Sequence, residues 1–296
     1  MARWYVSPLG ILPPMPSPRI LSPVLLIAAL LVAAAPAAAA PKPVTRGSTY
    51  LALGDSVAFG YQESGVVPAP DYSHATNFLG YPELLGRALH LRVFNAACPG
   101  ETSASLINAS APSNGCENQY RKSFPLHVRY SGSQLGYAVK FLKRHRNTRL
   151  VSLTVGANDY FLCQKTTSDG CGSPAEQSAT LTKIGTNVRK ILAAIRNKAH
   201  YRGQLAIVNY YSLDYSSAAI TGLAAQFNTA VRKPMKRFHA RLADGFGTFR
   251  AAALHSGGHA CAAGLLTQLS AGGCGIHPSY AGQALLASAL LRAIRL

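Results

Sequence analysis

The chain has 296 residues, of which 48% are hydrophobic and 14% are charged. This composition excludes a disordered or collagen-like chain, and the length suffices for one large domain or two small ones. Lysine and arginine outnumber aspartate and glutamate by 29 to 11, and the formal charge of +18 favours anionic surroundings such as cell-wall polymer, anionic lipid or nucleic acid.

The N-terminal segment has the pattern of a secretory signal. Arg3 and Arg19 precede an apolar run from Val24 to Ala35, and small residues follow it. A positive segment, an apolar segment and an Ala-x-Ala site are typical of a cleaved signal peptide, whereas the run is short for a retained membrane anchor. We therefore expect a secreted protein with three parts: a signal peptide over 1–40, a disordered linker over 41–48 and one folded domain over 49–296.

All six cysteines lie beyond the expected signal peptide. An even number of cysteines in an exported protein indicates disulfides. No pair has the C-x-x-C spacing of a zinc or redox site. Sequence alone allows several connectivities, and the three local pairs are the ones we expect to be bonded: Cys98–Cys116, Cys163–Cys171 and Cys261–Cys274.

Predicted strands alternate with predicted helices along the domain. Short apolar runs indicate strands at 49–53, 91–95, 150–155 and 205–209. Apolar residues at helical spacing, with proline in two first turns, indicate helices at 82–90, 135–146, 174–199, 220–239 (broken near Pro234) and 280–296. Long loops are expected at 61–78, 110–133 and 156–173. This alternation predicts an α/β fold, a three-layer α/β/α sandwich with a mostly parallel central sheet.

Small and polar residues follow three of the predicted strands. In parallel sheets, ligands bind beyond the carboxyl ends of the strands. Ser56 follows the first strand on a tight turn after Gly54, where a nucleophile is exposed at the sheet edge. A serine hydroxyl needs a base, and His277, just before the last helix, is the candidate. The N–H groups of Ser56 and Gly100 and the side-chain amide of Asn158 can stabilise an oxyanion.

Four segments of the chain resemble the GDSL or SGNH hydrolases, a family of exported esterases and lipases. The segments are 52–57 (ALGDSV), 95–102 (NAACPGET), 154–159 (TVGAND) and 277–282 (HPSYAG), in the family's order. The resemblance covers nearly the whole mature chain, and the local cysteine pairs also resemble those of actinobacterial exported lipases. It implies an SGNH-hydrolase domain of flavodoxin-like type over 49–296, in which Ser56 is the nucleophile, His277 the base, and Ser56, Gly100 and Asn158 the oxyanion hole.

The sequence departs from the family pattern at two positions. Val57 replaces the usual leucine, which is a conservative change. Cys274 stands where the family usually has an aspartate, three residues before the histidine. Some relatives hold the imidazole with a main-chain carbonyl instead, and the carbonyl of Cys274 is the acceptor we expect. A neutral acceptor predicts a lower rate or a shifted pH profile and not an inactive protein.

Other polar residues have simpler interpretations. Asp55 is expected to be a structural hydrogen-bonding residue, Asp159 to support Asn158 or its loop, and Asp214 to lie in a surface turn. His255 and His259 lack a third ligand and make a poor metal site, so we expect neither a metal nor another cofactor.

The resemblance and the residues together predict a monomeric, secreted serine esterase or lipase whose partner is an ester substrate, a lipid or an acylated small molecule or glycan. A polysaccharide deacetylase-type esterase and a phospholipase are alternatives of the same fold. Apolar loop residues favour a lipidic ester, although they can equally be core: Val66, Val67, Phe78, Leu79, Phe161 and Leu162.

A non-catalytic binding module is the alternative from another class. The missing aspartate at position 274 favours it, and the intact serine and histidine argue against it. Basic clusters at 140–149 and 232–241 suit an anionic envelope polymer or lipid surface better than a specific nucleic acid, for which no recognised motif is present.

Overall fold

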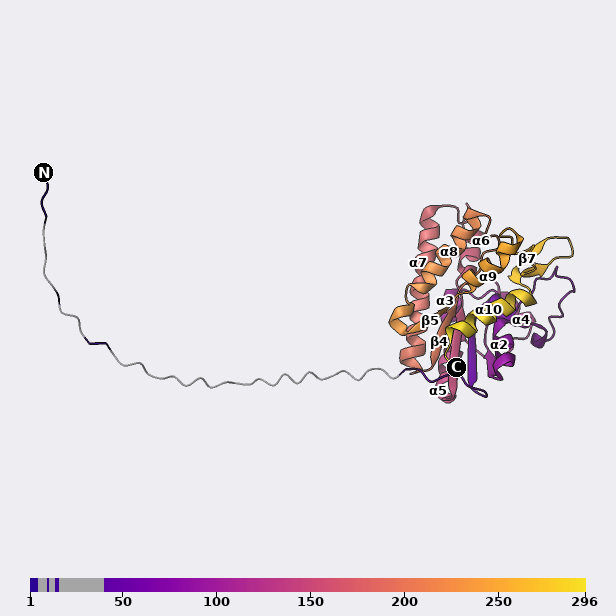
Figure 1. Ribbon diagram of the computed structural model, residues 1–296. Coiled ribbons are helices and arrows are strands. Elements are labelled where there is room, and N and C mark those ends of the chain that lie inside the picture. Colours follow the sequence, from indigo (N-terminus) through magenta and orange to yellow (C-terminus); the bar gives the residue numbers. More distant parts are fainter. Residues whose placement is uncertain (5–9, 11–13, 16–39) are drawn as a thin grey trace. The chain divides into compact units, whose positions relative to one another are not determined.

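The computed structural model describes residues 1–4, 10, 14–15 and 40–296 (Figure 1). The signal peptide expected over residues 1–40 lies mostly outside the described residues. Within the part of the chain that is described, no helix combines the length and the apolar character needed to span a bilayer.

Five parallel strands form the central sheet, in the order β2-β1-β3-β4-β5. This is the strand order of flavodoxin-like sheets, in which the switch point lies between β1 and β3. A separate antiparallel pair, β6 with β7, lies outside the sheet. The strands are β1 (Thr49–Gly54), β2 (Arg92–Asn95), β3 (Thr148–Thr154), β4 (Gln204–Val208), β5 (Ala240–Ala243), β6 (Leu266–Gln268) and β7 (Cys274–Pro278).

Helices cover both faces of the sheet, as Figure 1 shows. Helices α2, α9 and α10 pack together on one face, whereas α3, α5, α7 and α8 pack on the other. The helices are α1 (Ser56–Phe59), α2 (Tyr81–Leu89), α3 (Ser103–Ile107), α4 (Arg121–Ser123), α5 (Gln134–Arg144), α6 (Ala157–Thr166), α7 (Pro174–Ala193), α8 (Ala218–Arg232), α9 (Gly245–Ala253) and α10 (Tyr280–Ala293).

Alternate residues of each strand point into two separate cores. In β1, Tyr50 and Ala52 pack under α2 and α10, while Leu51 and Leu53 pack under α5 and α7. All four side chains are fully buried. Strands buried on both faces have near-continuous apolar sequences, which is why these runs were recognisable. The predicted three-layer α/β/α sandwich is confirmed.

Two expectations for the chain's organisation were wrong, and one strand was not expected. The segment expected as a linker over 41–48 packs on the domain: Val44 is buried, and its N–H donates to the carbonyl of Arg295 (2.8 Å). The loop expected over 156–173 contains helix α6, whose mixed polar sequence lacks an apolar stripe. The fifth strand, β5, was not among the expected strands; it follows a short 3₁₀ helix over Met235–Phe238, is only four residues long and has one exposed residue, Arg241.

Candidate active site

Ser56 lies at the carboxyl end of β1, next to the switch point of the sheet. The strand ends at Gly54, whose φ of 141° and close approach to the Thr154 carbonyl leave no room for a Cβ. Asp55 then caps helix α1, with its Oδ1 accepting the N–H of Val57 (3.0 Å). Ser56 is therefore the first helical residue, so its own N–H points out of the helix end without an intrahelical partner.

Asp55 is fixed within the core beneath the site. Its carboxylate accepts hydrogen bonds from the Tyr210 hydroxyl and from Val57 N–H. Burial raises the pKa of Asp55 to about 6, against the opposing effect of these hydrogen bonds. Because it caps α1 and lies beneath Ser56, Asp55 holds the turn in place, in agreement with the structural role expected for it.

His277 lies on β7 and faces Ser56. The distance from its Nε2 to Ser56 Oγ is 2.9 Å. Both residues are about nine-tenths buried, with exposed fractions of 9% each. The disulfide between Cys261 and Cys274 anchors the start of β7. A serine hydroxyl within hydrogen-bond reach of an imidazole is the arrangement of an activated nucleophile and its base.

The other imidazole nitrogen lies beside a carboxylate. Glu63 Oε1 is 2.8 Å from His277 Nδ1. The oxygen lies off the direction of the N–H bond, so the two groups are in close polar contact without a well-aligned hydrogen bond. Catalytic contacts of this kind commonly tighten only when substrate binds. The expectation that the main-chain carbonyl of Cys274 holds the imidazole was wrong, because the carboxylate of Glu63 occupies that place.

Glu63 is itself firmly held by β6 and β7. Its Oε1 accepts the N–H groups of Ile276 (2.6 Å) and His277 (3.0 Å), and its Oε2 accepts the hydroxyl of Thr267 (2.7 Å). Partial burial acts to raise the pKa of Glu63, but the neighbouring His277 imidazole and the hydroxyl of Thr267 outweigh it and lower the pKa to about 2. A Cβ at Gly275 would collide with this carboxylate, so glycine there permits the approach.

Gly100 follows β2 in a loop that also needs a glycine. Its φ is 82°, and a Cβ would lie 2.6 Å from the carbonyl oxygen of Asn114. The Asn114 N–H donates to the Gly100 carbonyl (2.8 Å), which joins the two sides of the loop. The disulfide between Cys98 and Cys116 closes this loop covalently. The N–H of Gly100 is thus carried by a tightly packed turn at the carboxyl edge of the sheet.

Asn158 is the second residue of α6, directly after β3. It is buried, and its Oδ1 accepts from Nδ2 of Asn114 (2.8 Å). The neighbouring Asp159 accepts both the N–H (2.7 Å) and the hydroxyl (2.6 Å) of Ser103, which ties the start of α6 to α3. Asp159 therefore supports the turn that carries Asn158, as expected.

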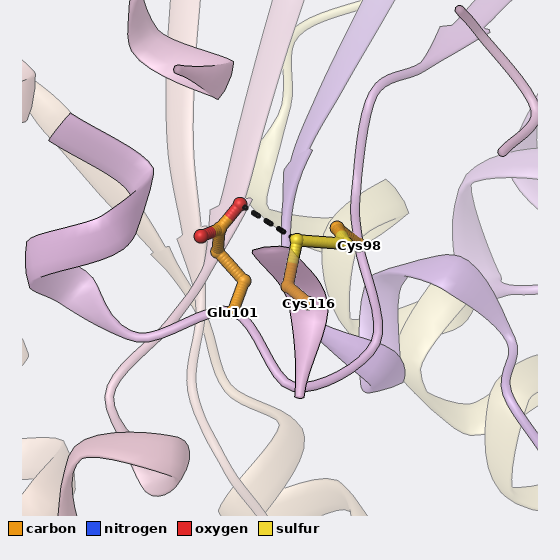
Figure 2. A group of neighbouring side chains, drawn as sticks. All are labelled: Cys98, Glu101 and Cys116. Atoms are coloured by element: carbon orange, nitrogen blue, oxygen red, sulfur yellow. Dashed lines mark hydrogen bonds between the residues drawn. A yellow bond between two sulfur atoms is a disulfide. The ribbon is translucent and has the colours of Figure 1, made fainter. Parts of the chain in front are cut away.

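A buried carboxyl group lies directly under the Gly100 loop. Figure 2 shows Glu101 directed towards the sulfur of Cys116, which is 3.6 Å away and bonded to Cys98. Because the two sulfurs are bonded to each other, they are not the free thiolates that zinc requires. Burial raises the pKa of Glu101 to about 8, although Ser105 and Gln134 donate hydrogen bonds to it.

The raised pKa of Glu101 predicts lower stability at higher pH. The folded protein holds this proton more tightly than the unfolded chain, so the stabilisation is complete below about pH 4.5 and is lost as the pH rises to about 8. Asp55 and Glu83, with pKa values raised to about 6 and 7 by burial, act in the same direction. We expect Tm to fall by roughly 5 °C or more between pH 5 and pH 8.

Calorimetry of the wild type and of Glu101→Gln at both pH values measures this effect. The glutamine cannot ionise, so the fall in Tm should be smaller in the variant. Parallel curves for the two proteins would contradict the assignment to Glu101.

Two cavities meet at the serine and histidine. One, of about 220 Å³, is lined by Ser56, Gly100, Asn158 and His277. The four residues predicted as a site are therefore brought together by the fold. The other cavity, of about 140 Å³, extends from Ser56 between α6 and α8 and has mostly apolar walls, which include Tyr160, Phe161, Leu223, Ala224, Phe227 and Ile276.

Most of the six apolar loop residues that favoured a lipidic ester do not line this cavity, and the alternative that they belong to the core is the better description of Phe78 and Val66. Among the six, only Phe161 lines the cavity. Phe78 is fully buried in the core beside α2, and Val66 pairs with Leu269 in an isolated β-bridge. The walls come largely from helices α6 and α8, and hydropathy does not predict that these two helices lie together.

The remaining polar candidates lie outside these two cavities. Asp214 accepts from the N–H and hydroxyl of Ser216 in a turn, and His259 is 3.3 Å from it.

The three expected disulfides are all present, with S–S distances of 2.07, 1.97 and 2.11 Å.

Comparisons with known proteins agree with this geometry. The model of the GDSL-like lipase/acylhydrolase family matches residues 52–285. The acetylxylan esterase from Geobacillus stearothermophilus, in the structure of a catalytic mutant, has 17% identity and a TM-score of 0.54, over 85% of this chain and 96% of that one. Phospholipase A1 from Streptomyces albidoflavus NA297 has 21% identity and a TM-score of 0.53, over 83% and 99%.

The comparison with curated proteins gave no significant match. At these identities the two solved structures establish a shared fold, and the family match covers every residue of the serine–histidine cluster. The match begins two residues before Gly54 and ends beyond His277. On this match, and with the parallel sheet and the clustered serine and histidine, the chain belongs to the GDSL-like lipase/acylhydrolase family.

Proposed function

We propose that this protein hydrolyses carboxylic esters through an acyl-enzyme on Ser56. The observation that carries the proposal is the contact of Ser56 Oγ with His277 Nε2, with Glu63 on the far side of the imidazole. Ser56 Oγ attacks the ester carbonyl carbon while His277 Nε2 takes the hydroxyl proton. Glu63 stabilises the imidazolium that forms, and it stays ionised because its pKa is lowered to about 2.

The negative charge that develops on the carbonyl oxygen needs donors. The N–H groups of Ser56 and Gly100 and the side-chain amide of Asn158 supply them in this proposal, since all three border the same cavity. The tetrahedral intermediate then collapses, and His277 gives its proton to the leaving alcohol. Water, deprotonated by the same imidazole, attacks the acyl-enzyme and releases the carboxylic acid.

Hydrolysis of p-nitrophenyl esters from acetate to palmitate tests the proposal. The protein should turn over at least one ester, and a fluorophosphonate probe should label it. A protein that is inert towards every ester and unlabelled would favour the non-catalytic binding module. The contact of Glu63 with His277 argues against that alternative, because it brings to the imidazole the carboxylate that position 274 lacks.

The apolar cavity beside Ser56 supports a substrate whose acyl group has several carbons, because such a group would fit within it. Its volume of about 140 Å³ is close to that of a cavity of roughly 150 Å³ that holds benzene in another protein. We therefore propose esters with acyl chains of about six carbons over acetylated polysaccharide.

Narrowing this cavity should change the acyl preference. Ala224 is buried in α8 and lines the cavity. The larger side chain of leucine in Ala224→Leu would therefore occupy part of the cavity. We expect kcat/KM for the hexanoate ester to fall about tenfold relative to the acetate ester.

Ala225→Leu is the matched control, because Ala225 is exposed on the same helix and lies outside this cavity. Equal losses on both esters in Ala224→Leu would assign the acyl group to another site.

We further propose that the protein acts outside the cytoplasm and near anionic surfaces. Three disulfides suit an oxidising compartment, and the N-terminal sequence has the pattern of a signal peptide. The formal charge of +18 suits binding to anionic polymer or lipid headgroups. Fractionation of cells at low and high salt, with detection of the protein in medium and envelope, tests both statements.

A further inference from the structure

A chain of three side chains leads from the surface to the proposed oxyanion donor. Lys165 Nζ donates to Oδ1 of Asn114 (2.7 Å), and Nδ2 of Asn114 donates to Oδ1 of Asn158 (2.8 Å). Lys165 is exposed near the end of α6, the same helix that carries Asn158. Asn114 belongs to the disulfide-closed loop. These three hydrogen-bonded side chains, Lys165, Asn114 and Asn158, are called the relay below, and they join two separate parts of the site.

The chemistry of the ammonium group sets the direction of this chain. An ammonium donates and cannot accept, so Asn114 must turn its oxygen towards Lys165. Its NH₂ group then faces Asn158 and can only donate there. Asn158 must in turn present its oxygen to Asn114, which leaves its own NH₂ group as the end that faces the cavity beside Ser56.

We propose that Asn114 and Lys165 are positioning residues that hold the amide of Asn158 with its NH₂ group towards the ester oxygen. The inference rests on the proposed function and deepens it. An Asn158 amide turned the other way would present a carbonyl oxygen to the developing oxyanion and would repel it. The relay therefore decides whether Asn158 helps or hinders the reaction.

The fold places Asn114 for this task. Its N–H is bonded to the Gly100 carbonyl, and its own carbonyl lies in contact with Gly100. The disulfide between Cys98 and Cys116 closes the loop two residues beyond it. Two of the three proposed oxyanion donors, Gly100 N–H and Asn158 Nδ2, thus depend on the position of one asparagine.

Asn114→Asp tests the relay. The carboxylate still accepts from Lys165 but has no donor for Asn158 Oδ1, so the Asn158 amide should turn its NH₂ group towards the carboxylate. We expect kcat on a p-nitrophenyl ester to fall about tenfold or more with KM little changed, approaching the loss of roughly 10²–10³-fold expected for Asn158→Ala. In the Asn158→Ala background, Asn114→Asp should cause no further loss.

Lys165→Glu reverses the polarity from the other end. The glutamate accepts from Asn114 Nδ2, which turns the Asn114 oxygen towards Asn158, and kcat should again fall with KM unchanged. Lys165→Met removes the ammonium group that orients the Asn114 amide but does not favour the opposite orientation, so its loss in kcat should be smaller. Gln164→Glu, an exposed change on the same helix, controls for added negative charge and should leave kcat unchanged.

The outcomes separate this inference from the proposed function. If the fold-losses in kcat of Asn114→Asp and Asn158→Ala multiply in the double variant, Asn114 acts independently of Asn158 and only supports the loop. That result would overturn the relay. An Asn158→Ala protein that loses activity while Asn114→Asp and Lys165→Glu do not would overturn it as well. A wild-type protein inert towards every ester would overturn the proposed function and the relay together.

Discussion

Ser56→Ala is expected to lower kcat for ester hydrolysis by about 10⁴-fold or more. The reaction as proposed forms a covalent bond to Ser56 Oγ, and no other hydroxyl is described within reach of His277 Nε2. Loss of a nucleophile of this kind removes the acyl-enzyme route and leaves only the oxyanion donors and substrate binding. Steady-state hydrolysis of p-nitrophenyl hexanoate and labelling by a fluorophosphonate probe measure the two consequences separately.

Ser270→Ala is a suitable control for this experiment. Ser270 is exposed in the turn between β6 and β7, and its N–H donates to the Gly65 carbonyl through the backbone alone. This variant should keep wild-type turnover and labelling. Turnover by Ser56→Ala above about a tenth of the wild-type rate would contradict the covalent mechanism.

Glu63→Ala is expected to lower kcat by about 10²–10⁴-fold. The alanine removes the charge beside His277 Nδ1 and the acceptor for two backbone N–H groups of β7. Glu63→Gln should lose less than the alanine variant, because its amide oxygen can still accept those N–H groups although the negative charge is gone. The ratio of the two losses separates orientation of the imidazole from stabilisation of the imidazolium.

The rival mechanism makes the opposite prediction for Glu63. If a main-chain carbonyl held His277 in solution, Glu63→Ala would keep kcat within a few-fold of the wild type. Glu176→Gln controls for removal of one negative charge, because Glu176 lies in the first turn of α7, outside both cavities at Ser56. Circular dichroism spectra and Tm values of all variants show whether each remains folded.

The fold was predictable because its signals are local. The first four strands of the sheet are near-continuous apolar runs, and the serine, glycine and asparagine follow three of them. Parallel strands bring their carboxyl ends to one edge, so the residues after Gly54, Asn95 and Thr154 meet without further information. Strand β5 is not predictable in this way, since four residues that include Arg241 carry almost no periodic signal.

Glu63 was not predictable from the same kind of signal. It lies in an irregular segment after α1, and its partner His277 is 214 residues further along the chain. No periodicity links two such positions, and the family pattern directs attention to the position three residues before the histidine. One clue was present: in a chain with only 11 acidic residues, an acid seven positions after the serine merits attention.

The pocket walls were missed for a related reason. Which apolar residues line a cavity depends on how α6 and α8 pack against each other near Ser56, and hydropathy does not report that packing. The same limit applies to Asn114, whose role arises from a contact between a disulfide-closed loop and a helix.

Each disulfide lies beside a segment that carries part of the site. Cys98–Cys116 encloses Gly100, Cys163 lies on the same helix as Asn158, and Cys274 begins the strand of His277. Covalent cross-links make the donors and the base preorganised, so little ordering entropy is lost when a substrate binds. In the proposed esterase, such a site would select its ester by the fixed shape of its walls, so that selectivity for chain length would be decided before the substrate arrives.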